Sequence, residues 1–117
     1  MKTIVAGSRS IGSFEIVESA IKESYFPISE IVSGTARGVD KLGEQWAKLN
    51  NIPIKCFPAD WETYGKSAGY KRNVQMGEYA DALIAVYDGE SKGTKHMIDI
   101  AKRLGLRVYI YNVKEKL

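Results

Sequence analysis

Five short apolar runs, separated by longer amphipathic stretches, make up most of the chain. The runs occupy residues 2–6, 30–33, 52–57, 82–87 and 107–111. Their length and β-branched content are typical of buried strands. Between them, apolar residues recur every three or four positions, which is the spacing of a helix face. This alternation predicts an α/β domain with a parallel five-stranded sheet and right-handed crossovers.

The predicted helices begin and end at recognisable residues. Ser13 can cap a first helix over residues 14–25, and a second helix ends at Asn50. A third helix occupies residues 71–79, and Gly105 ends the fourth. The apolar face of the first helix is expected to consist of Phe14, Val17, Ile21 and Tyr25, and that of the second of Val39, Leu42, Trp46 and Leu49.

The segment between the third strand and the third helix has no clear period, so residues 58–69 are expected to be irregular. Its Trp61 and Tyr64 can stack on a nucleobase or pack onto the core, and packing is favoured for Trp61. Cys56 lies in the third apolar run and is expected to be a small buried core residue.

Glycines and cations gather after the ends of the predicted strands. The glycines are Gly7, Gly34, Gly38, Gly65, Gly69, Gly89 and Gly93. In a parallel sheet these strand ends share one edge, and Arg9, Arg37, Lys66, Arg72, Lys92 and Lys95 are expected there too. Glycine lets a ligand approach the backbone, and helix N-termini attract anions. The pattern predicts a phosphate-binding site at this edge; the alternative for any single loop is an ordinary tight turn.

Composition excludes several classes of protein. The 117 residues are enough for one domain, residues 1–117, and 44% of them are hydrophobic, as in globular proteins. The net charge of +3 comes from 17 Lys and Arg residues that are spread along the chain, which argues against a nucleic-acid partner. One cysteine and one histidine argue against a transition-metal site, and we expect none. His96 is expected on a helix surface.

No apolar run approaches the roughly 20 residues that span a bilayer, so no membrane partner is expected. The N-terminal apolar run is interrupted at Gly7 and Arg9, too early for a signal peptide, so a cytoplasmic location is expected. Neither the dinucleotide fingerprint G-x-G-x-x-G nor the P-loop motif occurs, and we expect no cofactor.

Four motifs follow one another along the chain: A-G-S-R-S (6–10), S-G-T-A-R-G-V-D (33–40), A-D-W-x-x-Y-G-K-S-A-G-Y-K-R-N (59–73) and D-G-x-S-x-G-T (88–94). Together they resemble the YspA-type, YpsA-related branch of the SLOG superfamily. The resemblance implies a Rossmann-like three-layer domain, with expected strand order 3-2-1-4-5. The superfamily includes the Lonely Guy phosphoribohydrolases and the Rossmann part of DNA-processing protein A, and it is associated with nucleotide-derived ligands.

The sequence differs from the Lonely Guy phosphoribohydrolases at one motif. D-G-E-S-K-G-T stands where the Lonely Guy enzymes have their phosphate-binding loop, and Gly89, Gly93 and Thr94 match it. Lys95, His96 and Met97 follow where those enzymes continue into catalytic glutamates. R-N-V-Q-M (72–76) resembles their R-K-x-x-M, so Arg72 is a candidate anchor for a phosphate or ribose.

Individual residues have competing interpretations. Arg72 is expected at a helix start, where a cation is unfavourable unless an anion binds; it can instead pair with Asp60 or Glu62. Asp40 and Asp88 can contact ribose hydroxyls or simply complement a helix dipole. The ligand-binding candidates are Gly7, Ser8, Arg9, Ser33, Gly34, Arg37, Gly38, Asp40, Trp61, Lys66, Arg72, Asn73, Asp88, Gly89, Ser91, Gly93 and Thr94.

Three functions remain open at this stage. The leading one is binding, as a sensor or carrier, of a nucleotide or nucleotide-derived small molecule. The second is a hydrolase that cleaves an N-glycosidic or phosphoester bond, with Asp40, Asp88 or Glu90 as acid or base and Arg72 stabilising charge. The third is a protein or nucleic-acid interaction module. Related folds often pair through helices, so a homo-oligomer is compatible with the sequence, which does not identify the face.

Overall fold

The computed structural model describes residues 1–115 and has five parallel strands in one sheet, in the order β3-β2-β1-β4-β5. The predicted fold class and strand order are confirmed. The strands are β1 (Lys2–Gly7), β2 (Glu30–Ser33), β3 (Ile54–Cys56), β4 (Ala82–Tyr87) and β5 (Arg107–Asn112). The helices are α1 (Phe14–Ser24), α2 (Val39–Leu49), α3 (Trp61–Tyr64), α4 (Ala68–Tyr79) and α5 (Lys92–Arg103), with a 3-10 turn η1 (Gly65–Ser67).

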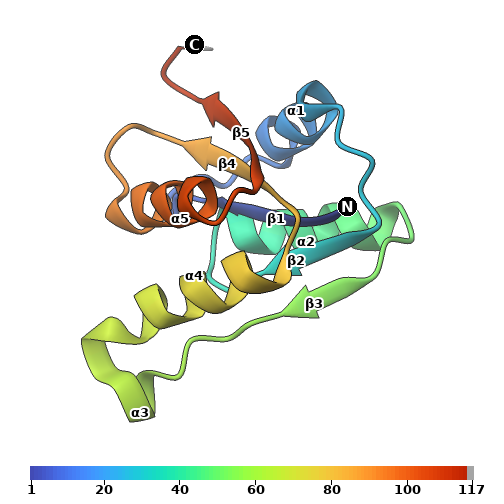
Figure 1. Ribbon diagram of the computed structural model, residues 1–117. Coiled ribbons are helices and arrows are strands. Elements are labelled where there is room, and N and C mark those ends of the chain that lie inside the picture. Colours follow the sequence, from blue (N-terminus) through green and yellow to red (C-terminus); the bar gives the residue numbers. More distant parts are fainter. Residues whose placement is uncertain (116–117) are drawn as a thin grey trace.

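Two pairs of helices cover the two faces of the sheet (Figure 1). Alternate residues of each strand point to opposite faces, so Val5 packs under α1 and α2 while Ile4 packs under α4 and α5. In β4 the same alternation sends Ile84 to the first face and Leu83 to the second. The central strands are therefore buried on both faces, as their unbroken apolar runs predict.

The centre of the sheet is the β1–β4 pair, where the strand order reverses. Gly7 pairs with Val86 at the end of this pair. A Cβ at Gly7 would lie 2.3 Å from the Val86 carbonyl oxygen and 2.7 Å from Cγ2 of Val39. Glycine is thus required at this position by backbone packing. Crevices at such a reversal are the usual ligand sites of open α/β sheets.

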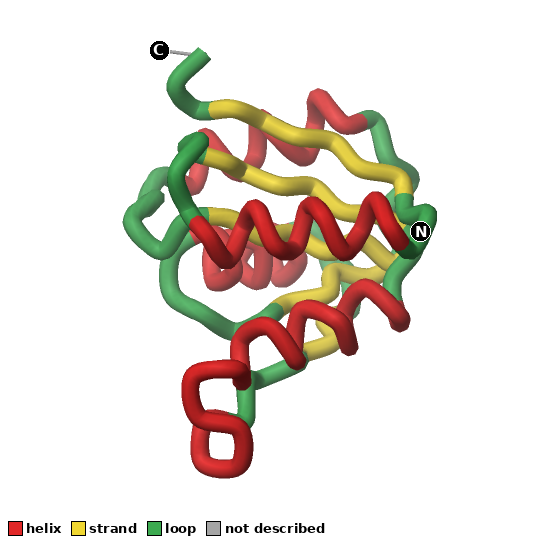
Figure 2. Tube along the Cα trace, turned by 60° about the vertical axis from the view of Figure 1, so that its left-hand side comes forward, coloured by secondary structure: helices red, strands yellow, loops and turns green. Residues whose placement is uncertain are grey.

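The segment predicted to be irregular is instead an ordered arm. Asp60 caps α3 by accepting a hydrogen bond from the Thr63 amide at 3.1 Å, and η1 leads directly into α4. Figure 2 shows this arm coiling away from the body of the domain below the strands. The arm therefore adds a wall beyond the sheet edge.

Three side-chain predictions at the ends of elements are wrong. Tyr25 is not on the apolar face of α1; it follows the helix in the left-handed conformation (φ 57°) and is almost fully exposed. Leu49 ends α2 and is also exposed. Cys56 is an exposed free cysteine, because β3 is an edge strand that pairs only with β2 and lacks cover there.

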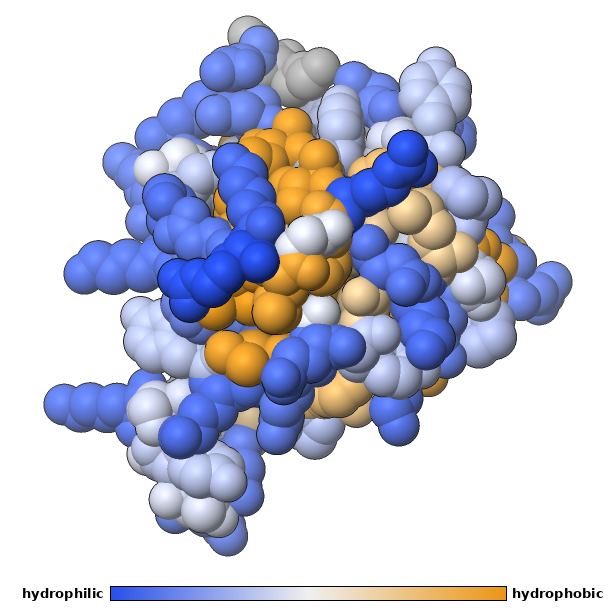
Figure 3. All heavy atoms as spheres, in the orientation of Figure 1, coloured by the Kyte–Doolittle hydropathy of each residue, from blue (hydrophilic) through white to orange (hydrophobic). Residues whose placement is uncertain are grey.

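The surface formed by α5 and β5 carries apolar side chains within a polar surround (Figure 3). Leu104 and Ile110 are its large exposed apolar residues, at 46% and 38% of full exposure. No helix within residues 1–115 has both the length and the apolar character that crossing a membrane would require.

Candidate functional site

The loops that follow β1, β2 and β4, together with the arm and α4, enclose a cavity of about 810 Å³ at the carboxyl edge of the sheet. This volume is within the range of about 300 to 1,000 Å³ for small-molecule sites. We call it the main cavity. Its lining consists of Ala6, Gly7, Ser8, Arg9, Ser10, Ala36, Arg37, Asp40, Trp61, Lys66, Gly69, Tyr70, Arg72, Asn73, Met76, Asp88, Glu90, Ser91, Gly93, Thr94 and Met97.

A second, smaller cavity of about 290 Å³ adjoins the main one, and we call it the side cavity. It is lined by Arg9, Gly34, Thr35, Ala36, Arg37, Pro58, Ala59, Trp61 and Arg72. Five of these residues also line the main cavity: Arg9, Ala36, Arg37, Trp61 and Arg72. Three arginines and one tryptophan therefore stand where the two cavities meet.

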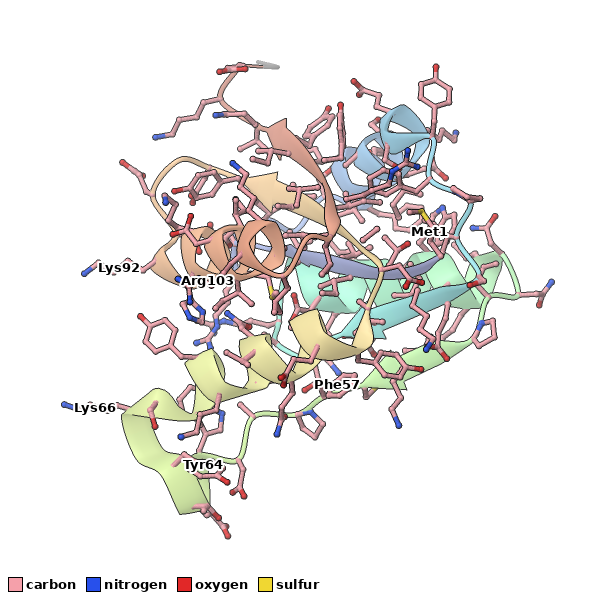
Figure 4. The ribbon with its side chains drawn as sticks, in the orientation of Figure 1. Met1, Phe57, Tyr64, Lys66, Lys92 and Arg103 are labelled. Carbon is pink, nitrogen blue, oxygen red and sulfur yellow. The ribbon has the colours of Figure 1, made fainter. Side chains whose placement is uncertain are left out.

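The main cavity has an apolar floor and a polar rim. Ala6 comes from β1, while Met76 from α4 and Met97 from α5 are almost fully buried in the core on that side. Arg9, Arg37 and Lys66 contribute positive charge to the rim, and Figure 4 shows Lys66 projecting from η1. The lining thus combines apolar side chains with cationic ones.

Arg72 is held rigidly in the wall between α4 and the β2–α2 loop. Its Nη1 donates a hydrogen bond to the Gly34 carbonyl oxygen, and its Nε donates to Oδ1 of Asn73 at 3.1 Å. α4 begins at Ala68, so Arg72 is in the second turn and not at the helix start that the sequence predicted. The predicted alternative of pairing with Asp60 or Glu62 is also wrong.

Asp40 is the one carboxyl group buried in this wall, at 7% of full exposure. Its Oδ2 accepts a hydrogen bond from the Ala36 amide at 3.1 Å, which closes the β2–α2 loop. Burial raises the pKa of Asp40 to about 6, while the Ala36 hydrogen bond and the charge of Arg72 oppose that rise. Asp40 can therefore exchange a proton near neutral pH.

Gly34 leaves space that the side chains of Arg72 and Asp40 occupy from two sides. A Cβ at Gly34 would lie 2.7 Å from Nη1 of Arg72 and 2.8 Å from Oδ2 of Asp40. Burial and the nearby charge of Arg9 lower the pKa of Arg72, and Asp40 opposes this. The charges of Arg72 and Arg9 both act on the buried Asp40 carboxyl group, although neither arginine forms an ion pair or hydrogen bond with it among the described residues.

The β4–α5 loop presents backbone amides at the opposite wall. Asp88 accepts hydrogen bonds from the amides of Glu90 and Ser91, both at 2.8 Å, and these bonds lower the pKa of its carboxyl group. Ser91 caps α5 by accepting from the Thr94 amide at 3.3 Å. The amides of Lys92 and Gly93 in the first turn have no acceptor inside the helix. Unpaired amides at a helix N-terminus favour a nearby anion.

Asn73 joins α4 to α5 across the cavity and orients the single histidine. Since its Oδ1 accepts from Arg72, its Nδ2 is the donor to the Gly93 carbonyl oxygen at 3.3 Å and to Nδ1 of His96 at 3.1 Å. His96 accordingly carries its hydrogen on Nε2. Its ring also packs edge-on against Tyr70, with centroids 4.5 Å apart, and burial lowers its pKa. His96 is half-buried on α5 and lines neither cavity, so it supports Asn73 and Tyr70 from behind the wall.

Trp61 belongs to the arm and lines both cavities, with 52% of its surface exposed. The preferred interpretation, that it packs onto the core, is wrong. A Cβ at Gly69 would lie 3.7 Å from Cη2 of Trp61 and 3.8 Å from Nη2 of Arg72, so the indole lies across Gly69 beside the guanidinium. Tyr64 lines neither cavity; its ring lies 4.8 Å from Nζ of Lys71.

The structure brings most of the predicted site residues to the main cavity. Gly34 lines only the side cavity, and Ser33, Gly38 and Gly89 line neither. Ser33 is fully buried and donates to Oε2 of Glu44 at 2.5 Å, so it supports the loop from below. Lys92 and Lys95, expected at the same edge, also line neither cavity, and Lys95 pairs with Asp99 at 2.8 Å.

Some residues of the main cavity were not among the predicted ligand-binding or catalytic residues. They are Ala6, Ser10, Ala36, Gly69, Tyr70, Met76 and Met97. The first five of these lie inside the quoted motifs and could have been included on that ground, and Gly69 was expected at this edge. Met76 and Met97 fall on the apolar faces of their helices, a pattern that indicates only burial. Within residues 1–115 no three His, Cys, Asp or Glu side chains are grouped to hold a metal ion.

Known proteins resemble this chain in sequence and in fold. The profile of the YspA, cpYpsA-related SLOG family matches residues 1–64. The Gene 61 protein of Mycobacterium phage D29 is 36% identical over 90 residues, which cover 72% of each chain. The structure of DNA processing protein A from Streptococcus pneumoniae covers 93% of this chain with a TM-score of 0.75 at 19% identity. This chain corresponds to 49% of that protein, so the likeness concerns the shared fold.

Proposed function

The chain belongs to the YspA, cpYpsA-related SLOG family, and from this we propose that it binds a nucleotide or nucleotide-derived ligand in the main cavity, as a sensor or carrier. One observation carries the proposal: an apolar floor, unpaired helix amides and arginines surround a single cavity of about 810 Å³. The ligand phosphate is assigned to the first turn of α5 and to Arg9, and the base or ribose to the apolar floor.

The energetic terms favour an anion over a neutral ligand. A helix N-terminus contributes about 0.3 to 2 kcal/mol to anion binding. Arg9 has no hydrogen bond or ion pair with any residue in the range 1–115, so it is free to form bidentate contacts with phosphate oxygens. Stacking of a base on an aromatic side chain such as Trp61 adds about 1 to 3 kcal/mol.

Calorimetric titration and thermal unfolding with a panel of nucleotides, nucleotide sugars and cyclic nucleotides test this proposal. A ligand at 100 times its Kd stabilises the fold by about 2.7 kcal/mol. Arg9→Gln is expected to weaken binding about tenfold. Arg107→Gln is the matched control, because Arg107 is exposed at the start of β5, on the opposite edge of the sheet. If the whole panel leaves the unfolding temperature unchanged, the proposal is wrong.

A second candidate function is hydrolysis of an N-glycosidic or phosphoester bond of such a ligand. The observation that favours it is the buried Asp40 carboxyl group in the cavity wall beside Arg72, with a pKa of about 6. A carboxyl group of this kind is suited to general acid or base catalysis near neutral pH. Long incubation with nucleoside monophosphates, followed by chromatography, tests it; product formation by wild type and none by Asp40→Asn is the expected result.

An interaction module is the third candidate. The structural neighbour is named for DNA processing, and at 19% identity that name supports only inclusion of nucleic acid in the binding panel. A single-stranded oligonucleotide that competes with nucleotides for the cavity at physiological salt would favour this function. Binding that disappears at moderate salt would indicate nonspecific charge attraction alone.

A further inference from the structure

The side cavity differs from the main cavity in its balance of charge. Arg9, Arg37 and Arg72 line it, and none of its lining residues is a carboxylate. The main cavity also has Arg9, Arg37 and Arg72, with Lys66 as a fourth cation, but Asp40, Asp88 and Glu90 offset them. The charged residues that line the side cavity are therefore all cations, although the charge of Asp40 in the adjoining wall also acts on Arg9 and Arg72.

The partners of these arginines leave their charge available. Arg72 donates hydrogen bonds from Nη1 to Gly34 and from Nε to Asn73, while Nη2 lies near Gly69 and Trp61. Within residues 1–115, Arg37 has no hydrogen bond or ion pair, as is also true of Arg9. Besides burial, the nearby charge of Arg9 lowers the pKa of Arg72. Several guanidinium groups in the lining of one small cavity suit a phosphate group.

The backbone of the side cavity is fixed before any ligand binds. Thr35 has a φ of 63°, the left-handed region that a β-branched residue rarely adopts. Two hydrogen bonds hold this conformation: the Thr35 amide donates to Oγ of Ser33 at 3.1 Å, and the Ala36 amide donates to Asp40. A fixed loop loses little entropy when it binds a ligand.

The size of the side cavity limits what it can hold. At about 290 Å³ it is at the lower limit for small-molecule sites, whereas the main cavity, at about 810 Å³, is in the upper part of the range. The two share Arg9, Arg37, Arg72 and Trp61 along their boundary. These volumes suit one ligand whose larger part is in the main cavity and whose smaller, charged part extends into the side cavity.

We infer that the ligand carries two anionic groups, one at the start of α5 and a second in the side cavity against Arg37, Arg9 and Arg72. This inference rests on the proposed function and specifies its ligand class: a nucleotide with a second phosphate. The second phosphate can be separate from the first, as in a nucleoside 3′,5′-bisphosphate, or contiguous with it, as in a diphosphate. Arg37 is the residue that selects for this second group.

Calorimetry with three matched sets of ligands tests the inference: the 5′-monophosphates of the four common ribonucleosides, their 5′-diphosphates and their 3′,5′-bisphosphates. Wild type is expected to bind at least one doubly phosphorylated set about ten- to a hundredfold more tightly than the monophosphates. The set that shows this gain distinguishes a contiguous from a separate second phosphate. Arg37→Gln is expected to remove most of the gain, because its guanidinium group is the proposed contact of the second phosphate.

Arg107→Gln again serves as the control for loss of one positive charge, and it should keep the full gain. Arg37 is exposed and lacks partners among the described residues, so its replacement is not expected to affect folding; the urea midpoint of each variant checks this. Equal affinity of wild type for singly and doubly phosphorylated ligands would overturn the inference and leave the proposed function intact. A gain that survives in Arg37→Gln would also overturn it. Failure of all three sets to bind would reject the proposed function itself.

Discussion

The Asp40 carboxyl group is the ionisable group whose proton affinity the fold raises into the neutral range. Its pKa rises from 3.8 to about 6, chiefly because the group is buried. The folded protein therefore keeps this proton to a higher pH than the unfolded chain does. The corresponding stability is present below about pH 4 and is lost as the pH rises through about 6, a total of about 3 kcal/mol.

Asp40→Asn is expected to make the unliganded protein more stable at pH 7 by about 1 to 3 kcal/mol, with the difference vanishing near pH 4. The amide removes the buried charge, and its oxygen can still accept the hydrogen bond from Ala36. Urea unfolding of both proteins at pH 4, 5, 6 and 7 measures the difference. A less stable variant at pH 7 would show that attraction to Arg72 outweighs the burial of the carboxylate.

Thr35 carries conformational strain in the wall of the side cavity. The left-handed region costs an L-residue about 1 to 2 kcal/mol, and glycine avoids that cost while losing somewhat more entropy on folding. Thr35→Gly is expected to raise the free energy of unfolding by about 0.5 to 1 kcal/mol. Thr35→Val, which keeps the branched Cβ, should match wild type. If valine and glycine behave alike in urea unfolding, the conformation is not strained.

At the scale of elements, the sequence predicted the strands well except for the edge strand β3. β2 and β4 have the predicted bounds, because central strands need unbroken apolar runs. β3 is shorter than predicted, and Cys56 is exposed, because an edge strand pairs on one side only. The strand order 3-2-1-4-5, which was itself expected, already places β3 at an edge, so this exposure could have been foreseen.

The arm and the cavity wall show a second limit of sequence reasoning. The Asp60 cap on Thr63 was a local signal for α3, but Gly65 interrupts the helical pattern after one turn. The position of His96 depends on Asn73, 23 residues away, and no local pattern encodes that pairing. The topology predicted which edge carries the site; the side chains that turn into it depend on how α4 and α5 pack.

Gly93, in the first turn of α5, is expected to affect folding and nucleotide binding in opposite ways. A Cβ at Gly93 would have no atom within 4 Å, so nothing in the described structure requires glycine there. Gly93→Ala is expected to stabilise the unliganded protein by about 0.5 to 1 kcal/mol through helix propensity. It should weaken nucleotide binding about tenfold or more, since the added methyl group meets a ligand at the helix amides.

Thermal unfolding and calorimetry on the same samples measure both effects of Gly93→Ala. Gln75→Ala, an exposed change in α4, is the control and should alter neither by much. Unchanged nucleotide affinity in Gly93→Ala would move the phosphate away from α5 and leave Arg9 as its remaining anchor.

For the molecule as a whole, folding, proton binding and ligand binding are linked through the main cavity. Residues from α2, α4, the arm and the β4–α5 loop surround it. Among the described lining residues, Asp40 is the one deeply buried ionisable group. An anion bound beside Arg72 repels the Asp40 carboxylate, so binding should raise the pKa of Asp40 further. By the same linkage, a proton on Asp40 should strengthen anion binding.

Nucleotide affinity is therefore expected to increase several-fold as the pH falls from 7 to 5 in wild type, through the window set by the Asp40 pKa of about 6. The phosphate group of the ligand titrates near the same pH and acts in the opposite direction, so each curve must be compared with that of Asp40→Asn, in which only the phosphate effect remains. Calorimetry in two buffers of different ionisation enthalpy would count the protons taken up. Wild type is expected to take up more protons, or release fewer, than Asp40→Asn on binding the same ligand. Equal proton exchange in the two proteins would show that the bound anion does not act on the Asp40 carboxyl group.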